Sequence, residues 1–223
     1  MTWQLLFSLP VLSLPQDNEA EKLYRNLERK LTAAKTIRFD VVIDSKVAGQ
    51  ELNIRSKVWL TRDNKHRHEA EITKGDKREK ITVVLDGVKS RGITDGGLVV
   101  PLTTGPDETK VLTGLLLRVG WFGNWDHNPK MDVSALLPAS GFKLGPKEDV
   151  GKRAAQSVTL AVTLKNVRGD PSVKCTLWLD TETGLPLKRV MEMDGDKRGR
   201  VMETYSEFVL DAKMDAKLFI VPD

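Results

Sequence analysis

Cysteine is nearly absent from this chain, which has a single one, Cys175, in 223 residues. One cysteine cannot form an internal disulfide, so a hydrophobic core has to stabilise the fold. With 40% hydrophobic residues the chain is long enough to build such a core. Cys175 sits in an alternating apolar pattern, where a thiol is usually inert packing. We therefore expect one domain with one core.

A large excess of charge of one sign is also lacking. The 35 Lys and Arg residues are nearly balanced by 31 Asp and Glu residues, which leaves a net charge of +4. Runs such as residues 77–80 and 194–198 mix both signs, as solvated turns and strand ends do. A nucleic-acid-binding protein usually gathers its basic residues on one face. We therefore expect no nucleic-acid partner.

Motifs for catalysis and for metal binding are missing as well. No Ser-His-Asp order, phosphate-binding Walker loop or nucleophile elbow occurs in a convincing context. His66 and His68 would share one face of a strand, but no third ligand is evident, and His127 could join them only through folding. We therefore expect no enzyme activity, no cofactor and no metal site. A hydrolase or a metal protein remains the least favoured alternative.

Long hydrophobic runs are limited to the N-terminus. Residues 5–14 form an apolar run that is too short for a membrane-spanning helix of about 20 residues. Its length is typical of a signal-peptide core, although no Lys or Arg precedes it and no clear cleavage site follows; a buried N-terminal segment is the alternative. We expect a signal peptide over 1–15, one domain over 16–223, and a soluble periplasmic protein, because no cysteine follows the run to carry a lipid anchor.

Two periodicities organise the rest of the chain. Apolar residues recur at helical spacing between Ala20 and Ala34, which predicts an amphipathic helix. Period-two alternation then predicts strands over 37–43 and 52–60, joined by a turn at Ala48-Gly49. Further strands are expected over 66–73, 79–85, 89–93, 157–164, 173–180, 186–194 and 201–210.

These nine or ten strands have short connections and no repeating strand-helix-strand pattern, so they predict an α+β fold with an antiparallel sheet. A sheet of this many twisted strands curls strongly. Its concave face then has to be filled by side chains, helices or a ligand. This geometry makes a hydrophobic pocket plausible.

The segment 104–137 contains an unusually apolar predicted helix. Pro106, Asp107 and Glu108 suit a helix start, and Gly120 suits its end. Each large apolar side chain gains about 1.5–3 kcal/mol on burial, so this helix has to dock. It either fills the core of the sheet or gates a cavity for acyl chains, and the two interpretations overlap. Its apolar residues and the aromatic residues that follow are Val111, Leu112, Leu115, Leu116, Leu117, Val119, Trp121, Phe122 and Trp125.

The C-terminal part carries a family resemblance. The pattern W-L-D-x-x-T-G-L-P-L-K over 178–188 is followed by a hairpin, a strand and L-F-x-x-P over 218–222. This order resembles the lipoprotein carrier (LolA-like) and outer-membrane lipoprotein-sorting family, from about Ala20 to Pro222. The resemblance implies an incomplete β-barrel whose mouth is covered by helices. It also implies an envelope carrier or chaperone for lipid or lipoprotein acyl chains; a periplasmic interaction or sensor module of the same fold is the alternative.

The resemblance also suggests site residues. Trp59 and Arg62 match the family's L-W-x-x-R segment, whose arginine holds the lid closed, but Asp63 stands where a proline often follows and could pair with Arg62 or Lys65. Arg62 is thus the candidate lid latch. A membrane-bound donor or acceptor protein and a monomeric state are expected. The candidate ligand-binding residues are Trp59, Leu112, Leu115, Leu116, Val119, Trp121, Phe122 and Trp125.

Overall fold

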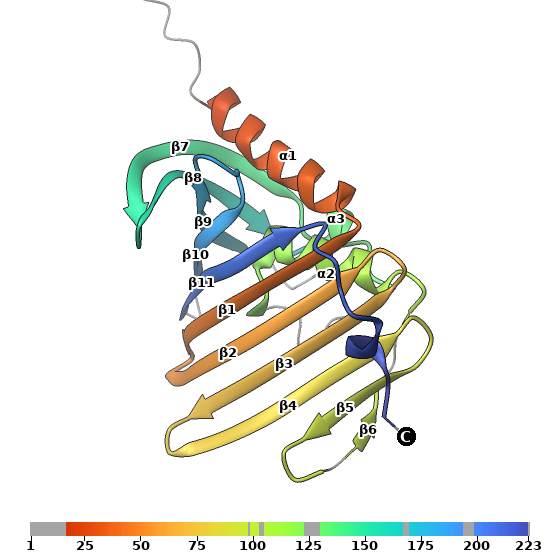
Figure 1. The fold of residues 1–223 in the computed structure, drawn as a ribbon. Helices are drawn as coiled ribbons and strands as arrows, with labels where there is room; N and C mark the ends of the chain where they lie inside the picture. The colour runs from red at the N-terminus through yellow and green to blue at the C-terminus, as the bar shows by residue number, and fades with distance from the viewer. Residues whose placement is uncertain are drawn as a thin grey trace, which may run out of the picture.

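The computed structural model describes residues 17–97, 99–102, 105–122, 130–166, 170–193 and 199–222. Within these residues eleven strands form one antiparallel sheet in the order β6-β5-β4-β3-β2-β1-β11-β10-β9-β8-β7 (Figure 1). The sheet is open, since β6 and β7 lie at opposite ends of this order. The predicted curved antiparallel sheet with covering helices is confirmed. The expected signal peptide lies outside the described residues.

The bounds of the elements are as follows. The helices are α1 (Asp17–Ala33), α2 (Glu108–Val119) and α3 (Val133–Leu136), with a 3-10 turn η3 (Ala216–Phe219). The strands are β1 (Thr36–Val47), β2 (Gln50–Thr61), β3 (Lys65–Lys74), β4 (Lys77–Asp86), β5 (Ser90–Thr94), β6 (Val99–Pro101), β7 (Ala139–Val150), β8 (Arg153–Thr163), β9 (Ser172–Asp180), β10 (Pro186–Met193) and β11 (Gly199–Leu210). None of the helices in the described residues is long and apolar enough to cross a bilayer.

The β1–β2 hairpin has the predicted turn. Val47 pairs with Gln50, so the connection consists of Ala48 and Gly49 alone. Both have positive φ, 50° and 77°, as the two-residue hairpin turn that matches the strand twist requires. This tight turn fixes the register in which Phe39 lies opposite Val58.

The sheet has two distinct faces. One of them, which we call the helix face, is covered by α1, α2 and α3, and the other, the outer face, carries η3 (Figure 1). Along β1 the buried residues Ile37, Phe39, Val41 and Ile43 alternate with more exposed ones and lie on the helix face. On the outer face, η3 packs on β3 and β4, where Phe219 is buried and Arg67 Nη1 donates to the Leu218 carbonyl at 3.3 Å.

The D-x-x-T-G segment has a structural role. Asp180 Oδ1 accepts hydrogen bonds from the backbone N–H groups of Glu182 (3.0 Å) and Thr183 (2.7 Å). Gly184 follows at a φ of 66°, and Lys30 Nζ of α1 donates to the Thr183 carbonyl at 2.6 Å. Burial alone would raise the pKa of the Asp180 carboxyl, but the Thr183 hydrogen bonds and Arg153 hold it below its usual range. The motif therefore shapes a turn and ties it to α1.

Two strands were not predicted from the sequence, the short β6 and the longer β7. β7 contains Gly141, Gly145 and Pro146, and its pairing with β8 shifts register twice, so it lacks a regular alternation. Proline is tolerated because β7 is an edge strand. β7 contributes Phe142, whose ring centroid lies 5.1 Å from that of Tyr24 on α1.

Candidate functional site

Helix α2 lies on the helix face of the sheet, on the same side as α1 (Figure 1). Asp107 precedes its first turn, so the helix begins two residues after Pro106, which we had placed in the first turn. Leu112, Leu116 and Leu117 are buried in the main core. Val111 and Leu115 pack with Val133 of α3 in a second, small cluster. The apolar stripe of α2 therefore fills much of the hollow in the sheet.

The N-terminal end of α2 is tied to the β2–β3 turn. Asn64, at a φ of 61°, donates from Nδ2 to the Gly105 carbonyl at 3.0 Å. Its Oδ1 accepts from the backbone N–H of Thr109, also at 3.0 Å. One amide side chain therefore satisfies both a donor and an acceptor at the start of the helix.

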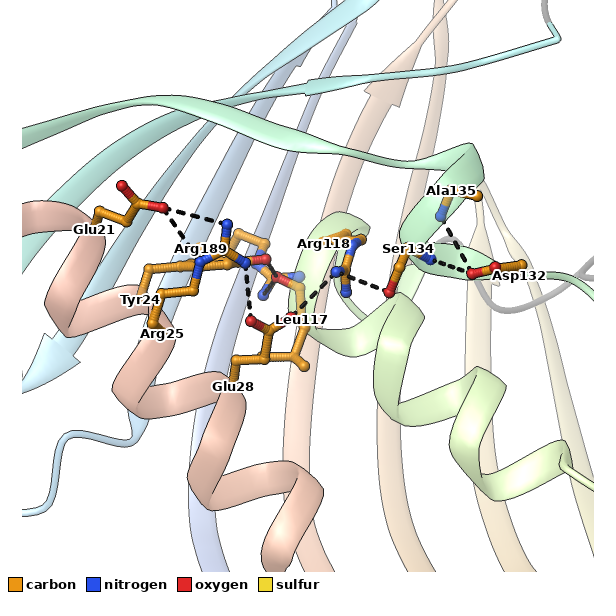
Figure 2. Close-up of polar contacts among 10 residues, drawn as sticks. All are labelled: Glu21, Tyr24, Arg25, Glu28, Leu117, Arg118, Asp132, Ser134, Ala135 and Arg189. Atoms are coloured by element: carbon orange, nitrogen blue, oxygen red, sulfur yellow. Dashed lines mark hydrogen bonds and ion pairs between the residues drawn. The ribbon is translucent and has the colours of Figure 1, made fainter.

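The C-terminal end of α2 is held by buried polar side chains. Its Leu117 carbonyl accepts from Arg189 Nη2 of β10 at 3.2 Å and from the Tyr24 hydroxyl of α1 at 3.4 Å (Figure 2). Arg189 is 1% exposed. Burial raises the pKa of Tyr24 to about 12, so its hydroxyl keeps the proton that it donates. Two elements far apart in sequence thus cap the same helix end.

Glu203 of β11 binds the backbone that directly follows α2. Its Oε1 accepts from the backbone N–H of Phe122 at 2.8 Å, and its Oε2 accepts from the Tyr205 hydroxyl and lies 4.0 Å from Arg189 Nη1. Burial raises the pKa of the Glu203 carboxyl, and Arg189 opposes this effect. Gly120, at a φ of 71°, is required here because a Cβ would collide with the Glu203 carboxylate. We call Arg189, Glu203, Tyr205 and Tyr24 the polar clamp.

Trp121 extends this attachment across the sheet. Its indole N–H donates to His68 Nε2 of β3 at 3.2 Å, and Ser56 Oγ lies 3.0 Å from the same nitrogen. Since Nε2 accepts from the indole, the neutral ring carries its proton on Nδ1. Burial lowers the pKa of His68 to about 3. The Trp121 ring also meets Phe39 edge to face, with centroids 5.4 Å apart.

A second polar chain connects the three helices. Arg118 Nη2, at the end of α2, donates to Glu28 Oε1 of α1 at 3.1 Å and to Ser134 Oγ of α3 at 3.2 Å (Figure 2). Glu28 Oε2 also accepts from Arg25 Nη1 at 2.9 Å. Arg118 therefore fixes α2 relative to both neighbouring helices.

A cavity of about 420 Å³ lies between α1, α2 and the ends of β1 and β2. Its apolar wall consists of Leu31, Ala34, Ile37, Leu60 and Leu117. The polar and charged residues around it are Glu28, Thr32, Lys35, Thr61, Arg62, Asp107, Thr109, Lys110, Thr113, Arg118 and Ser134, and Gly114 completes the lining. The space thus combines an apolar wall with polar ends, as a pocket for an amphiphile requires. We call it the helix cavity.

None of the predicted ligand-binding residues that the structure describes lines the helix cavity. Leu112, Leu115, Leu116 and Trp121 are buried in the core, and Val119 and Phe122 are half-buried against it. Trp59 lies on the outer face, because its neighbours Val58 and Leu60 point to the helix face. Trp125 lies outside the described residues.

Arg62 does line the helix cavity. Its Nη2 donates to the Thr32 carbonyl in the last turn of α1, and its backbone N–H donates to the Lys35 carbonyl at 2.9 Å. Asp63 pairs with Lys65 at 2.6 Å. Arg62 therefore contacts α1, one of the helices that cover the sheet.

The sequence interpretation missed Arg118, Arg189 and Glu203. Glu203 shares a strand face with Val201 and Tyr205, so a charged residue at an inward position was the available signal. His66 and His68 both lie on the helix face, as expected. In the part of the chain that the structure describes, no three His, Cys, Asp or Glu side chains are grouped so that they could hold a metal ion.

No family model and no curated protein sequence matches this chain. Among solved structures, the Mycobacterium tuberculosis lipoprotein LppX matches 90% of this chain and 99% of its own, with a TM-score of 0.55 and 11% identity. LprF from Mycobacterium bovis matches 89% and 96%, with a TM-score of 0.54 and 12% identity. A LolA superfamily protein from Nitrosomonas europaea matches 91% and 97%, with a TM-score of 0.40 and 13% identity. At these identities the likeness is one of fold alone, and LppX and LprF, whose TM-scores exceed 0.5, carry it.

The polar clamp predicts a large stability change. Arg189→Met leaves the Glu203 carboxylate buried without its cation, so we expect the free energy of unfolding to fall by about 3–5 kcal/mol in urea denaturation. Arg189→Met combined with Glu203→Gln should recover part of this loss. If the losses in the free energy of unfolding caused by Arg189→Met and by Glu203→Gln simply add in the double variant, the two side chains do not interact and the clamp is contradicted. Lys46→Met is the control: Lys46 pairs with Glu51 at 2.7 Å, but both side chains are 71% exposed, so the change should leave the free energy of unfolding nearly unchanged.

His68 predicts a pH dependence of stability. Its pKa is about 3 in the folded protein, below the unfolded value of about 6.5, so the unfolded state binds the proton first as the pH falls. The contribution is complete above pH 6.5 and is lost toward pH 3, by up to about 1.4 kcal/mol per pH unit. Urea denaturation at pH 7.0, 5.5 and 4.5 should show a steeper loss for the wild type than for His68→Gln, which retains an acceptor for Trp121. Parallel pH profiles would contradict this role.

Proposed function

We propose that this protein is an envelope carrier or chaperone that binds lipid or the acyl chains of lipoproteins, without catalysis. The observation that carries this proposal is the helix cavity, which lies between the covering helices and the sheet of a LolA-like fold. Its volume of about 420 Å³ lies within the range of about 300–1,000 Å³ typical of ligand pockets. Apolar side chains along one wall favour hydrocarbon, which needs little directional bonding.

The packing of α2 limits what the cavity holds. Because Leu112 and Leu116 occupy the hollow of the sheet, the space left beside α1 is small compared with the whole concave face. A single acyl chain is therefore the cargo that suits this arrangement. A larger cargo would require α2 to move away from the sheet and would break its contacts with the polar clamp.

The filled interior also favours a second candidate function. A domain whose concave face is occupied by its own helix is suited to an interaction or sensor module, in which the surface and not the interior recognises a partner. Such a module would hold a stable protein partner and would transfer no lipid. The lipid-binding experiment below separates the two functions.

Export to the periplasm is part of the proposal. Residues 1–15 act as the signal peptide, 16–223 form the mature domain, and the mature protein works as a monomer between a membrane-bound donor and an acceptor. The support comes from the apolar run at 5–14 and from the LolA-like fold.

Arg62 serves as the latch in this proposal. It joins the end of β2 to the last turn of α1 and lines the cavity, so a cargo that enters there meets its guanidinium group. Its bond to Thr32 then has to adjust. Arg62 therefore couples loading to the position of α1.

The carrier function is tested by filling the cavity. Thr32→Trp places a large ring in the lining from an exposed position, so we expect at least a tenfold loss of affinity for an acylated peptide with little change in stability. Native mass spectrometry of wild-type protein from the periplasm should show co-purified lipid, and the intact mass should show loss of about the first 15 residues.

The matched control is Ala33→Trp, which is exposed on the next residue of α1 and does not line the cavity. It should bind like the wild type. A wild-type protein that stays empty in the presence of acylated peptides contradicts the carrier and supports the interaction module.

The latch is tested by Arg62→Leu. Arg62 is exposed, so the change should leave the protein folded, and because it frees the last turn of α1 we expect acyl loading and release to change at least threefold in rate. Stopped-flow fluorescence with a labelled acyl peptide measures both rates. Arg55→Leu, also exposed on β2 but outside the lining, is the control. Unchanged rates in Arg62→Leu would contradict the latch.

A further inference from the structure

Arg118 is the most deeply buried cation in the lining of the helix cavity. It is 6% exposed, although it lies in the last turn of α2. Its bonds to Glu28 and Ser134 both use Nη2. Its Nε is buried with no hydrogen-bond partner among the described residues. A guanidinium group has five donors, so Arg118 retains donor capacity in the lining of the cavity.

A second polar atom on α2 is also buried without a hydrogen-bond partner among the described residues. Thr109 lines the cavity at the other end of the helix, and its Oγ1 is buried without a partner in the described part of the chain. Nine residues separate Thr109 from Arg118, which is about 14 Å along a helix axis. The apolar wall, including Leu31 and Leu60, completes the cavity. Thr109 and Arg118 therefore place polar atoms without a partner near the two ends of α2, beside the apolar wall of the cavity.

The charges around the cavity favour an anion. Four basic side chains line it, Lys35, Arg62, Lys110 and Arg118, against two acidic ones, Glu28 and Asp107. Glu28 is shared, because it also accepts from Arg25 outside the lining. It therefore neutralises Arg118 only in part, and the excess positive charge attracts anions.

We propose that the helix cavity takes an amphiphile with one acyl chain and an anionic headgroup, either a carboxylate or a phosphate. The headgroup oxygens accept from the free donors of Arg118, which needs a small shift of its side chain to expose Nε. The hydrocarbon lies along the apolar wall. This inference rests on the proposed carrier function and narrows it from acyl chains in general to one chemical class.

The size of the expected preference follows from the hydrogen bonds. A bond between a buried cation and an anionic acceptor contributes about 1.5–3 kcal/mol, which corresponds to roughly a 10- to 100-fold difference in affinity. A neutral hydroxyl headgroup on the same chain accepts only a weaker bond. Chains of equal length with different headgroups therefore isolate the contribution of Arg118.

The experiment measures binding of dodecanoate, dodecyl phosphate and dodecanol to the delipidated protein at pH 7.5 by isothermal titration calorimetry. We expect at least one of the two anions to bind wild type tenfold or more tightly than the alcohol. The better anion identifies the headgroup. Arg118→Met should reduce that affinity 10- to 100-fold and change dodecanol affinity less than threefold.

Arg25→Met is the matched control. Arg25 shares Glu28 with Arg118 but is 44% exposed and does not line the cavity, so the variant should keep the wild-type preference for anions. An equal loss in Arg25→Met would assign the preference to general surface charge and overturn the role of Arg118.

The two proposals fail in different ways. If wild type binds the anions and dodecanol equally well, the headgroup inference is overturned and the carrier function stands. If none of the three binds, the carrier function fails, and the inference fails with it. The wild-type comparison needs no variant, so it remains decisive even if Arg118→Met does not fold.

Discussion

The position of α2 depends on one buried ion pair, Arg189 with Glu203, inside the sheet. The two side chains are 1% and 0% exposed and lie 4.0 Å apart, and each also binds the α2 segment. Arg189 donates to the last turn of α2, and Glu203 accepts from the backbone that leaves it. The pair replaces the water that would otherwise satisfy these groups at a helix end. These contacts fix the C-terminal end of α2 and so set where the rest of the helix packs on the sheet.

With α2 fixed at both ends, the hollow of the sheet is divided. The side of the helix that carries Leu112 and Leu116 is core, whereas the side that carries Leu117 and Arg118 borders the helix cavity. One face of the helix is therefore core, and another face borders a cavity. The cavity lies between elements that are joined by polar contacts, Arg118 with Glu28 and Arg62 with Thr32. Polar contacts at the edges of a cavity can exchange with a ligand's headgroup or with water at lower cost than an apolar core can open.

Much of the fold could be predicted from local pattern. Alternation along β1 and β2 identified both strands, and the Ala48-Gly49 pair identified the turn between them, because a turn of two residues restricts which backbone conformations are allowed. β7 escaped this reasoning, since an edge strand with two register shifts needs no regular alternation. The residues of the candidate site were harder to predict from the sequence. Trp59 matched a family motif, yet a residue on the opposite strand face cannot reach the helices. The clamp residues gave only a weak signal, a charge on an apolar strand face.

The sequence by itself determined nine of the eleven strands that the structure describes, the turn between β1 and β2, the two principal helices and the family-like order of the C-terminal hairpins. These features follow from the spacing of apolar residues and from backbone restrictions within a few residues. Only the tertiary structure decided which polar groups meet. Leu117 and Arg189 are 72 residues apart in the chain, and Phe122 and Glu203 are 81 apart. Their meeting depends on the curvature of the whole sheet and on the depth at which α2 docks. Local periodicity carries no information on either quantity, so the clamp and the cavity beside it emerge only when the sheet has folded around the helix.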